Sequence, residues 1–329
     1  MEPVILTSSP HIHSNTNLTS VMYDVIIALT PALLVSIYYF GYQSLLISMT
    51  AVCSAVLFEA ICLRLAKKKD IWKTAFDGSA IITGILLAMN LPPSSPFWMV
   101  MIGSFVAIVI AKQTFGGLGH NIFNPAMVAR VFLLISFPVQ MTRWTRPSFL
   151  KSQLIDTAVT PDALSAATPL GMLKTDGLQK VQETYTHTAD FLGTIPGSLG
   201  EVSALALLIG AAYLLYRKVI TWEIPVTFLG SLFAFTGIFW LIYPDKFADP
   251  VFHMVTGGAI LGAFFMATDM VTSPLTRKGM LIFGTSIGLL TGLIRLFGGY
   301  PEGVSFAIVI MNAFVPLIDQ YTGVRKFGS

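Results

Sequence analysis

The sequence predicts an all-α integral membrane protein with about ten transmembrane helices. Of its 329 residues, 54% are hydrophobic and only 11% are charged, whereas soluble domains carry about 25% charged residues. The mean hydropathy is +0.73. The apolar residues gather in runs that approach the roughly 20 residues needed to cross a bilayer. A repeated pattern divides these runs into two sets of five, which predicts two related halves.

Five apolar runs precede a long polar stretch and five follow it. In chain order they are Val21–Tyr39, Ser44–Leu65, Gly78–Leu91, Phe97–Lys112, Phe123–Pro138, Val202–Tyr216, Trp222–Tyr243, Met254–Val271, Met280–Phe297 and Val304–Tyr321. Some runs are shorter than a full span, which membrane proteins tolerate where backbone lines a cavity or cofactor site. The predicted parts are an N-terminal segment (1–20), a first five-helix repeat (21–138), a loop (139–201), a second repeat (202–321) and a tail (322–329).

The distribution of lysine and arginine predicts the orientation of these helices, because such residues concentrate in cytoplasmic loops. With the N-terminus inside, most of the basic loop residues lie inside, among them Lys67, Lys68 and Lys69. Most of the remainder lie in the 139–201 loop, which is long and therefore weighs little under this rule. Both termini are predicted to be cytoplasmic and the 139–201 loop external. The first twenty residues lack the apolar core of a cleavable signal peptide.

An internal repeat relates the two halves. Leu86–Leu91 lines up with Phe264–Asp269, and the sequence FGGLG at 115–119 lines up with FGGYP at 297–301. Each half has five predicted spans, so the two copies must be inverted in the membrane. Inverted repeats place ligand sites near the interface between the copies. The alternative is a chance likeness between two Gly-rich apolar stretches.

The stretch Phe115–Ala126, which reads FGGLGHNIFNPA, contains the first candidate site. Glycine allows a planar ring to approach the backbone closely, so Gly117 is a candidate contact. Asn121 and Asn124 are three residues apart, on one face of a predicted helix start. Their amides offer donors and acceptors to the polar edge of such a ring. The alternative is that one asparagine only caps the helix, with Pro125 in its first turn.

Charged residues within or at the ends of apolar runs form a second group of candidates, since such residues are costly in a membrane and usually functional. The acidic ones are Asp24, Glu59, Asp77, Asp269 and Asp319, and the basic ones are Arg130 and Arg295. Arginine pairs bidentately with phosphate or carboxylate, which makes Arg295 a candidate ligand for a phosphate. The alternative for each residue is a structural ion pair or an interface anchor.

Several activities are excluded by what the sequence lacks. The two cysteines, Cys53 and Cys62, are nine residues apart on one predicted helix and point in opposite directions. An iron–sulfur cluster needs four thiolates, so no metal site is predicted. There is no phosphate-binding loop and no dinucleotide-binding glycine motif. Neither ATP nor NADH is expected to bind this chain, and no nucleic-acid partner is expected.

The most informative motif is DALSAATPL at residues 162–170, in the polar loop. Pro169 disfavours helical backbone at Thr168 and pushes that residue into an extended conformation. The neighbours of Thr168 on its N-terminal side are small. We therefore expect its hydroxyl to be open to modification by another enzyme.

This motif resembles the covalent flavin-attachment site of the NqrB/RnfD family of membrane redox subunits. The ten spans and the FGGLGHNIFNPA stretch extend the resemblance over nearly the whole chain. The chain length favours the RnfD branch, which lacks a long N-terminal extension. The resemblance implies a fold similar to urea transporters and FMN joined to Thr168 through a phosphoester. It also implies that a flavin transferase recognises Asp162 and Ser165.

The resemblance has further implications for cofactors and partners. It implies a second, unattached riboflavin near Asn121 and Asn124, and a location in a bacterial or archaeal inner (cytoplasmic) membrane. Partner subunits would carry iron–sulfur clusters, a second covalent FMN and the nucleotide site of an ion-translocating ferredoxin:NAD⁺ oxidoreductase. Repeat symmetry suggests a seat for the FMN ring at Phe297–Gly303, including Gly299 and Tyr300, together with the outer loop Pro92–Pro96, and Arg295 is available to its phosphate. The alternative is a glycine turn that only ends the helix and binds no ligand.

The expected function is therefore electron transfer between partner subunits, coupled to Na⁺ or H⁺ movement. Two alternatives belong to other classes. One is a ten-helix inverted-repeat transporter or channel for a small solute, although such a protein has no evident use for a modifiable threonine in an outer loop. The other is a purely structural anchor for a redox complex.

Overall fold

The structure is a computed structural model of the full chain. It describes residues 17–68, 70–145, 147, 167–184, 196–201, 203–300 and 302–323. Within these ranges the chain is helical and contains no strand. Asp162 and Ser165, the residues predicted for flavin-transferase recognition, lie outside the described residues.

The described residues of the first half form seven α-helices and two short irregular helices. They are α1 (Leu18–Phe40), α2 (Tyr42–Leu65), α3 (Ile71–Ala75), α4 (Ser79–Met89), α5 (Phe97–Phe105), the π-helix η1 (Val106–Ile110), the 3₁₀-helix η2 (Gln113–Phe115), α6 (Pro125–Ser136) and α7 (Pro138–Met141). The π-helix continues directly from α5, so the fourth predicted span is one helical rod.

Between the two halves, the described residues include two short helices. The short helices are α9 (Pro169–Thr175) and α10 (Leu178–Thr184). The later ones are α12 (Ala204–Tyr216), α13 (Glu223–Ile242), α14 (Pro250–Val255), α15 (Ala259–Leu261), the π-helix η4 (Gly262–Met266), α16 (Arg277–Phe297) and α17 (Val304–Thr322).

Among the described residues, seven helical stretches are long and apolar enough to cross a membrane. The protein is therefore a multi-pass membrane protein. Of the remaining predicted spans, α6 has 12 residues and α12 has 13. The run Met254–Val271 is divided into α14, α15 and η4, because Gly257 and Gly258 both adopt positive φ and interrupt the helix. The layout of ten spans in two inverted repeats remains a prediction.

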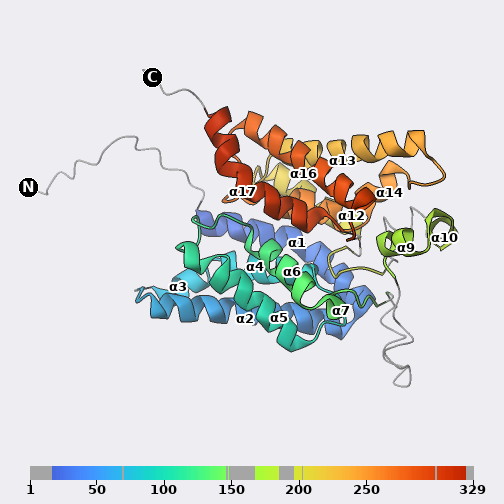
Figure 1. Ribbon diagram of the computed structural model, residues 1–329. Helices are drawn as coiled ribbons and strands as arrows, with labels where there is room; N and C mark the ends of the chain where they lie inside the picture. The colour runs from blue at the N-terminus through green and yellow to red at the C-terminus, as the bar shows by residue number, and fades with distance from the viewer. Residues whose placement is uncertain are drawn as a thin grey trace, which may run out of the picture.

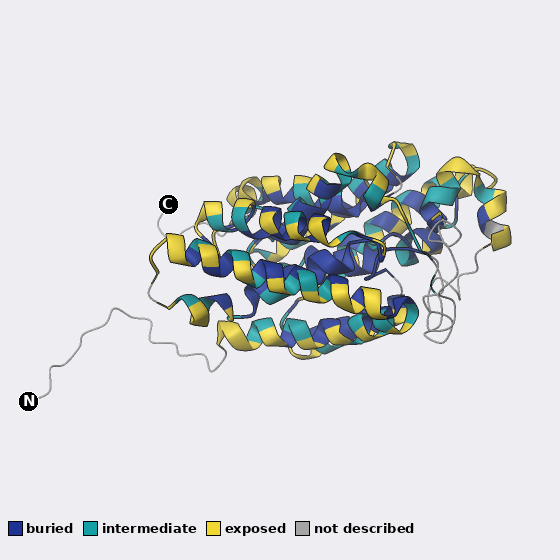
Figure 2. Cartoon of the chain, turned by 90° about the horizontal axis from the view of Figure 1, so that it is seen from below, coloured by how far each residue is buried: buried dark blue, intermediate teal, exposed yellow. Residues whose placement is uncertain are grey.

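The two halves lie side by side, with α1 close to their boundary (Figure 1). The start of α1 and the end of α17 lie at one end of the molecule, and α9 and α10 lie at the other. Buried residues fill the centre, and exposed positions line the outward helix faces (Figure 2). Many of these exposed positions are apolar, including Leu34, Leu57 and Leu241. Such faces suit contact with lipid tails.

Glycines allow the closest helix contact of the second half, between α13 and α16. A Cβ at Gly284 would stand 2.1 Å from the Thr227 hydroxyl, and one at Gly288 would stand 2.3 Å from the Phe228 carbonyl oxygen. Both distances are far below van der Waals contact. Small residues spaced four apart let membrane helices pack backbone to backbone.

The end of the predicted external loop is folded into the protein. Its described residues between 196 and 201 are all buried. Leu199 donates its backbone N–H to the Leu91 carbonyl, and Gly200 donates to the Met89 carbonyl at the end of α4. The last residues of the 139–201 segment therefore pack into the protein, and Leu199 and Gly200 satisfy backbone groups at a helix end.

Candidate functional site

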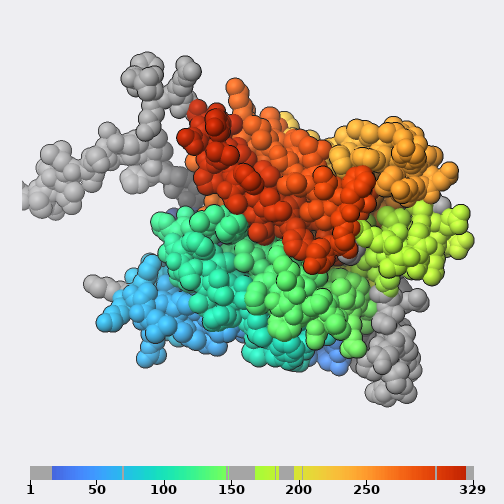
Figure 3. Space-filling model, in the orientation of Figure 1, coloured from blue at the N-terminus to red at the C-terminus, as the bar shows by residue number. Residues whose placement is uncertain are grey.

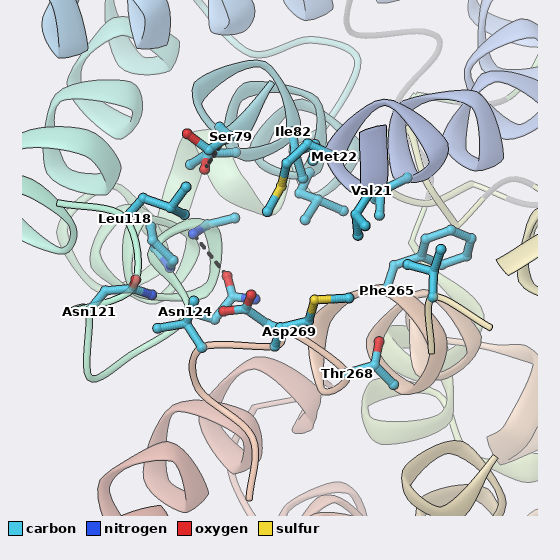
Figure 4. A pocket seen from close by; sticks show the side chains of 18 of the residues that line it. Val21, Met22, Ser79, Ile82, Leu118, Asn121, Asn124, Phe265, Thr268 and Asp269 are labelled. Carbon is cyan, nitrogen blue, oxygen red and sulfur yellow. Dashed lines mark hydrogen bonds between the residues drawn. The ribbon is translucent and has the colours of Figure 1, made fainter. Parts of the chain in front are cut away.

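A pocket of about 260 Å³ opens between the two halves, at the end of the molecule where α1 begins. It is lined by residues from α1, α4, the loop before α6, α12 and η4. Its walls are mostly apolar. The polar lining comes from Ser79, Thr83, Lys112, Asn121, Asn124, Thr268 and Asp269. Asn121, Asn124 and Asp269 lie on one side of the pocket and Ser79 lies on the opposite side (Figure 4).

Asn124 caps helix α6. Its side-chain oxygen accepts the backbone N–H groups of Ala126 and Met127, and Pro125 occupies the first helical position. Its Nδ2 donates to the Met266 carbonyl oxygen at 3.1 Å. The capping alternative is thus confirmed for Asn124. Since this amide already has partners for both its nitrogen and its oxygen, its main role is to join α6 to η4 beside the pocket.

Asn121 has more capacity for a ligand. The expectation that both asparagines share a helix face is wrong, because α6 begins only at Pro125 and Asn121 precedes it in a turn. Its Nδ2 donates to the Phe123 carbonyl oxygen at 3.1 Å. Its Oδ1 accepts no hydrogen bond from the described part of the chain. Asn121 is therefore the asparagine that can offer an acceptor to a molecule in the pocket.

The glycines of this turn adopt backbone that other residues rarely adopt. Gly116, Gly117 and Gly119 have φ values of +115°, +94° and +89°. A Cβ at Gly119 would meet no other atom within 4 Å, and Gly119 lines the pocket. The turn therefore needs glycine for its conformation, and Gly119 leaves room for a ligand.

A buried ion pair forms the polar wall opposite Asn121. The Lys112 ammonium donates to both carboxylate oxygens of Glu59, at 2.7 and 2.8 Å, and to the Ser79 hydroxyl at 2.7 Å. Both charged side chains are at most 2% exposed. Glu59, predicted as a costly intramembrane acid, thus has a structural partner. Lys112 is not among the predicted site residues, yet it lines the pocket.

Arg130 connects the two halves in the interior. Its guanidinium donates to Asn90 Oδ1 at 2.6 Å and forms a hydrogen-bonded ion pair with Glu302, which comes just before α17. Glu201, from the buried 196–201 segment, lies 3.8 Å from the same guanidinium. Two carboxylates from distant parts of the chain therefore lie beside one buried cation.

Several buried polar atoms in the interior of the protein have no hydrogen-bond partner among the described residues. They are Arg130 Nε, Ser198 Oγ, Glu201 Oε1, both ring nitrogens of His253, Thr291 Oγ1 and Arg295 Nε. Buried polar groups normally bond to protein or to ordered water. The region between the halves therefore has a polar interior suited to internal water.

The remaining acidic candidates hold elements together. Asp24 joins α1 to α12. Asp77 accepts hydrogen bonds from the first residue of α4, and Asp319 accepts one from the segment before α16. The donors are Tyr213 and Arg217 for Asp24, the backbone and hydroxyl of Ser79 for Asp77, and the backbone of Leu275 for Asp319. The structural alternative applies to these three residues. Asp269, in contrast, lines the pocket and accepts from the Thr272 hydroxyl.

Thr168 adopts the extended backbone that its position before proline predicts, with φ −66° and ψ 156°. The expectation of an open hydroxyl is wrong. Thr168 is only 6% exposed, and its Oγ1 accepts the backbone N–H of Gly171 at 3.0 Å as the N-cap of α9. The small neighbours do not expose it, since contacts made by the following helix bury it.

Helix α9 packs on the second half of the protein. Leu170 forms a small apolar cluster with Val181 of α10 and with Ala248 and Phe252 near α14. Figure 3 shows this packing of α9 and α10 against the second half. At the far end of α9, the Lys174 ammonium donates to the backbone carbonyl oxygens of Gly298 and Tyr300. The Thr168 segment thus contacts the predicted FMN seat.

The three residues of that predicted seat have different surroundings. Arg295 is buried, and its terminal nitrogens donate to the carbonyl oxygens of residues 253, 256 and 257. Gly299 is exposed, and a Cβ at this position would meet no other atom within 4 Å. Tyr300 is 44% exposed and lies over the Phe306 ring. Gly299 and Tyr300 therefore leave room for a ring, whereas Arg295 mainly braces α14.

The chain is thus a multi-pass helical membrane protein with an apolar pocket at one end and a docked threonine-bearing helix at the other. Residues 5–328 match the NQR2, RnfD, RnfE family. The chain belongs to this family of membrane oxidoreductase subunits, as the resemblance of its motifs predicted.

Relatives from several bacteria match over almost the full length. The chain is 46% identical to the D subunit of the proton-translocating ferredoxin:NAD⁺ oxidoreductase complex of Clostridium ljungdahlii, with 98% of this chain and 96% of the relative covered. It is 44% identical to the D subunit of the Na⁺-translocating ferredoxin:NAD⁺ oxidoreductase complex of Acetobacterium woodii, covering 98% and 95%. It is 43% identical to the D subunit of the ion-translocating oxidoreductase complex of Cronobacter sakazakii, covering 98% of each chain.

Proposed function

We propose that this chain relays electrons within an ion-translocating ferredoxin:NAD⁺ oxidoreductase complex, with FMN joined to Thr168 and a second, unattached flavin in the inner pocket. The names of three full-length relatives support the class of activity. The observation that carries the cofactor proposal is the presence, in one chain, of the docked Thr168 segment at one end and the pocket at the other. A bound flavin supplies one- and two-electron chemistry.

The inner pocket fits a flat, mostly apolar ligand with a polar edge. Its volume of about 260 Å³ is near the lower end of typical small-molecule sites, which span roughly 300–1,000 Å³. Asn121 offers an acceptor oxygen, and the Gly119 backbone leaves close approach open. Phe264 and Phe265 add aromatic wall. These features support riboflavin as the occupant.

The outer site fits an attached ring less tightly. The residues that would position it are Thr168, as the attachment point, and the exposed Gly299 and Tyr300 beside the end of α9. Asp162 and Ser165, which would be read by the flavin transferase, lie outside the described residues. Among the described residues, Nε is the one Arg295 nitrogen that has no hydrogen-bond partner. Arg295 would therefore reach the phosphate only through Nε. We therefore assign Arg295 a supporting role.

The inverted-repeat layout is part of the same proposal. Asn90 donates to the Leu86 carbonyl oxygen, and Thr268 donates to the Phe264 carbonyl oxygen. These are equivalent positions in the repeat, and both side chains bond four residues back at the end of a broken span. The start of α1 and the end of α17 lie together, and α9 lies at the opposite end. The positions of the termini at one end and of α9 at the other support cytoplasmic termini and an external Thr168.

The partners follow from the proposed complex, but the coupling ion does not. The other subunits would supply iron–sulfur clusters, a second covalent FMN and the nucleotide site, and a flavin transferase would act during maturation. One relative is named for protons and another for Na⁺, at 46% and 44% identity. Overall similarity therefore does not select the ion. The small-solute transporter is not favoured, because the full-length relatives are named as oxidoreductase subunits.

Replacing Thr168 tests the attachment. In membranes that contain the flavin transferase, Thr168→Val is expected to remove the FMN mass from the intact protein, because valine has no hydroxyl to esterify. Thr175→Val is the matched control, since Thr175 is an exposed threonine of the same helix. It should keep the full FMN mass.

The measurements are intact-mass spectrometry and flavin fluorescence in a denaturing gel. Extractable flavin, measured after denaturation, should be unchanged in both variants, because the pocket lies at the other end of the molecule. Wild-type protein without added FMN mass would refute the attachment. A wild-type complex without extractable flavin would refute the second cofactor.

A further inference from the structure

The contacts of Lys174 stand out among the lysines outside the membrane-spanning helices. Its Nζ donates to the carbonyl oxygen of Tyr300 at 2.7 Å, to that of Gly298, and more weakly to that of Ile294 at 3.4 Å. These carbonyls belong to the last turn of α16 and to the glycine turn that follows. The α9 segment and the end of α16 are 120 or more residues apart in sequence.

The electrostatics of this contact are favourable. Helix α16 ends at Phe297, so the carbonyl oxygens of Gly298 and Tyr300 lie just beyond its C-terminus, while that of Ile294 also accepts the Gly298 N–H. The C-terminus also carries a partial negative charge that attracts cations. An ammonium that donates to several such oxygens makes charge-assisted hydrogen bonds, which are stronger than neutral ones. The Lys174 ammonium therefore lies in a position that is electrostatically favourable for a cation.

The opposite end of α9 is held by apolar contact. Leu170 is 3% exposed. A Cβ at Gly257 would stand 2.3 Å from Leu170 Cδ1 and 2.6 Å from an Arg295 nitrogen, so Leu170 sits directly against the α14–α15 turn. With seven residues, α9 is too short to be stable alone. Its position depends on these contacts at its two ends.

We propose that Lys174 is a positioning residue that fixes the Thr168 segment on the second half and keeps the Thr168 hydroxyl buried until the segment undocks. The docking itself is independent of any cofactor. What it positions, an attached flavin beside Gly299 and Tyr300, rests on the proposed function. Thr168 lies six residues from Lys174, about 9 Å along the helix, so a shift at Lys174 moves the attachment point.

The burial of Thr168 has a consequence for maturation. With 6% of Thr168 exposed and its oxygen bonded to the Gly171 N–H, an enzyme active site does not reach the hydroxyl in the docked state. The flavin transferase must act on the undocked segment. Removing the Lys174 contacts should therefore increase the rate at which Thr168 is modified. Once FMN is attached, its ring should be more mobile.

Lys174→Met tests the docking, because it removes the donors and keeps an unbranched side chain of similar length. Lys180→Met is the matched control on α10, where Lys180 is exposed and pairs only with Asp176 among the described residues. Lys174→Arg restores the charge and donors. The first measurement is hydrogen exchange of the α9 amides in wild-type and variant protein without flavin, reconstituted in nanodiscs.

We expect exchange in α9 to be about tenfold faster in Lys174→Met, which corresponds to loss of charge-assisted hydrogen bonds. Lys180→Met should match wild type, and Lys174→Arg should recover most of the protection. Exchange in α16 away from its last turn reports on global folding and should be unchanged. If α9 exchanges equally fast in Lys174→Met and Lys180→Met, the proposal is wrong.

The second measurement is the rate at which purified flavin transferase, supplied with FAD, adds FMN mass to the flavin-free protein. In this step the Thr168 oxygen bonds to the FMN phosphorus, the pyrophosphate bond of FAD breaks, AMP leaves, and the hydroxyl proton is released to solvent. Lys174→Met should be modified several-fold faster than wild type and should then show lower flavin fluorescence anisotropy. An unchanged rate overturns the burial part of the proposal. If no protein gains FMN mass on Thr168, the proposed function fails, while the exchange experiment still decides whether Lys174 holds α9.

Discussion

The pocket between the two halves and the α9 segment are held in place by different forces. The pocket is bounded by five elements from both halves and is tied together by buried polar contacts, in particular Lys112 with Glu59 and Asn124 with Met266. The α9 segment rests on the outside of the second half through Leu170 and Lys174. One site is formed by the fold, and the other is added to it.

This difference indicates how each site should respond to change. Removing one partner of a buried charged pair lowers the free energy of unfolding by several kcal/mol. Such a change at the pocket therefore destabilises the whole fold. A short surface helix opens locally at little cost to the rest of the protein. We therefore expect substitutions in the buried polar contacts of the pocket to change global stability, and substitutions on α9 to change only local exposure.

The largest effect is expected from Lys112→Met. The change leaves Glu59 buried without its cation, and should lower the free energy of unfolding on the order of 3–5 kcal/mol. The double variant with Glu59→Gln should recover most of this loss, because no buried charge then remains. Thermal unfolding of the purified protein measures both. A single variant as stable as wild type would contradict the structural role of the pair.

A smaller effect is expected from Asn124→Ala. The substitution removes the acceptor for two N–H groups at the start of α6 and the hydrogen bond to Met266. A loss of about 2 kcal/mol in the free energy of unfolding is expected, together with weaker retention of the pocket ligand. Thermal unfolding and extractable flavin are the measurements. Retained stability would mean that α6 does not depend on this cap.

The smallest effect on stability is expected from Asn121→Ala. Asn121 makes one side-chain hydrogen bond to the described residues, within its own turn, so the free energy of unfolding should change by only about 0.5 kcal/mol. Riboflavin affinity should nevertheless fall several-fold, the value of one lost hydrogen bond. Titration of flavin-free protein by riboflavin fluorescence measures this. An affinity equal to wild type would remove Asn121 from the site and weaken the contrast with Asn124.

Local signals in the sequence predicted local features well. The extended conformation of Thr168 follows from Pro169, and the start of α6 at Pro125 with an asparagine cap is one of the two alternatives that the FGGLGHNIFNPA stretch allows. The bounds of α1, α2, α13, α16 and α17 differ from the predicted runs by three residues or fewer. Each of these depends on residues within a few positions of one another, and short-range sterics decide them.

The errors came from contacts between distant segments. The motif predicts an open Thr168, but α9 is docked by Leu170 and Lys174 on residues some 80 to 130 positions later. The hydrogen bonds of Leu199 and Gly200 to the end of α4 likewise join segments that are far apart in the sequence, and no local pattern predicts them. The sequence pattern places Lys112 at the end of an apolar run, and only the fold buries it beside Glu59.

The sequence by itself determined that the chain is helical and membrane-embedded, which motifs carry its candidate chemistry, and which family it belongs to. Hydropathy, caps and proline effects act over a few residues and can be read directly. Only the tertiary structure decided that Asn121 and not Asn124 has an acceptor open to a ligand, that Glu59 is paired, and that Thr168 is covered. Burial and charge pairing depend on which distant segments meet, and no local pattern contains that information.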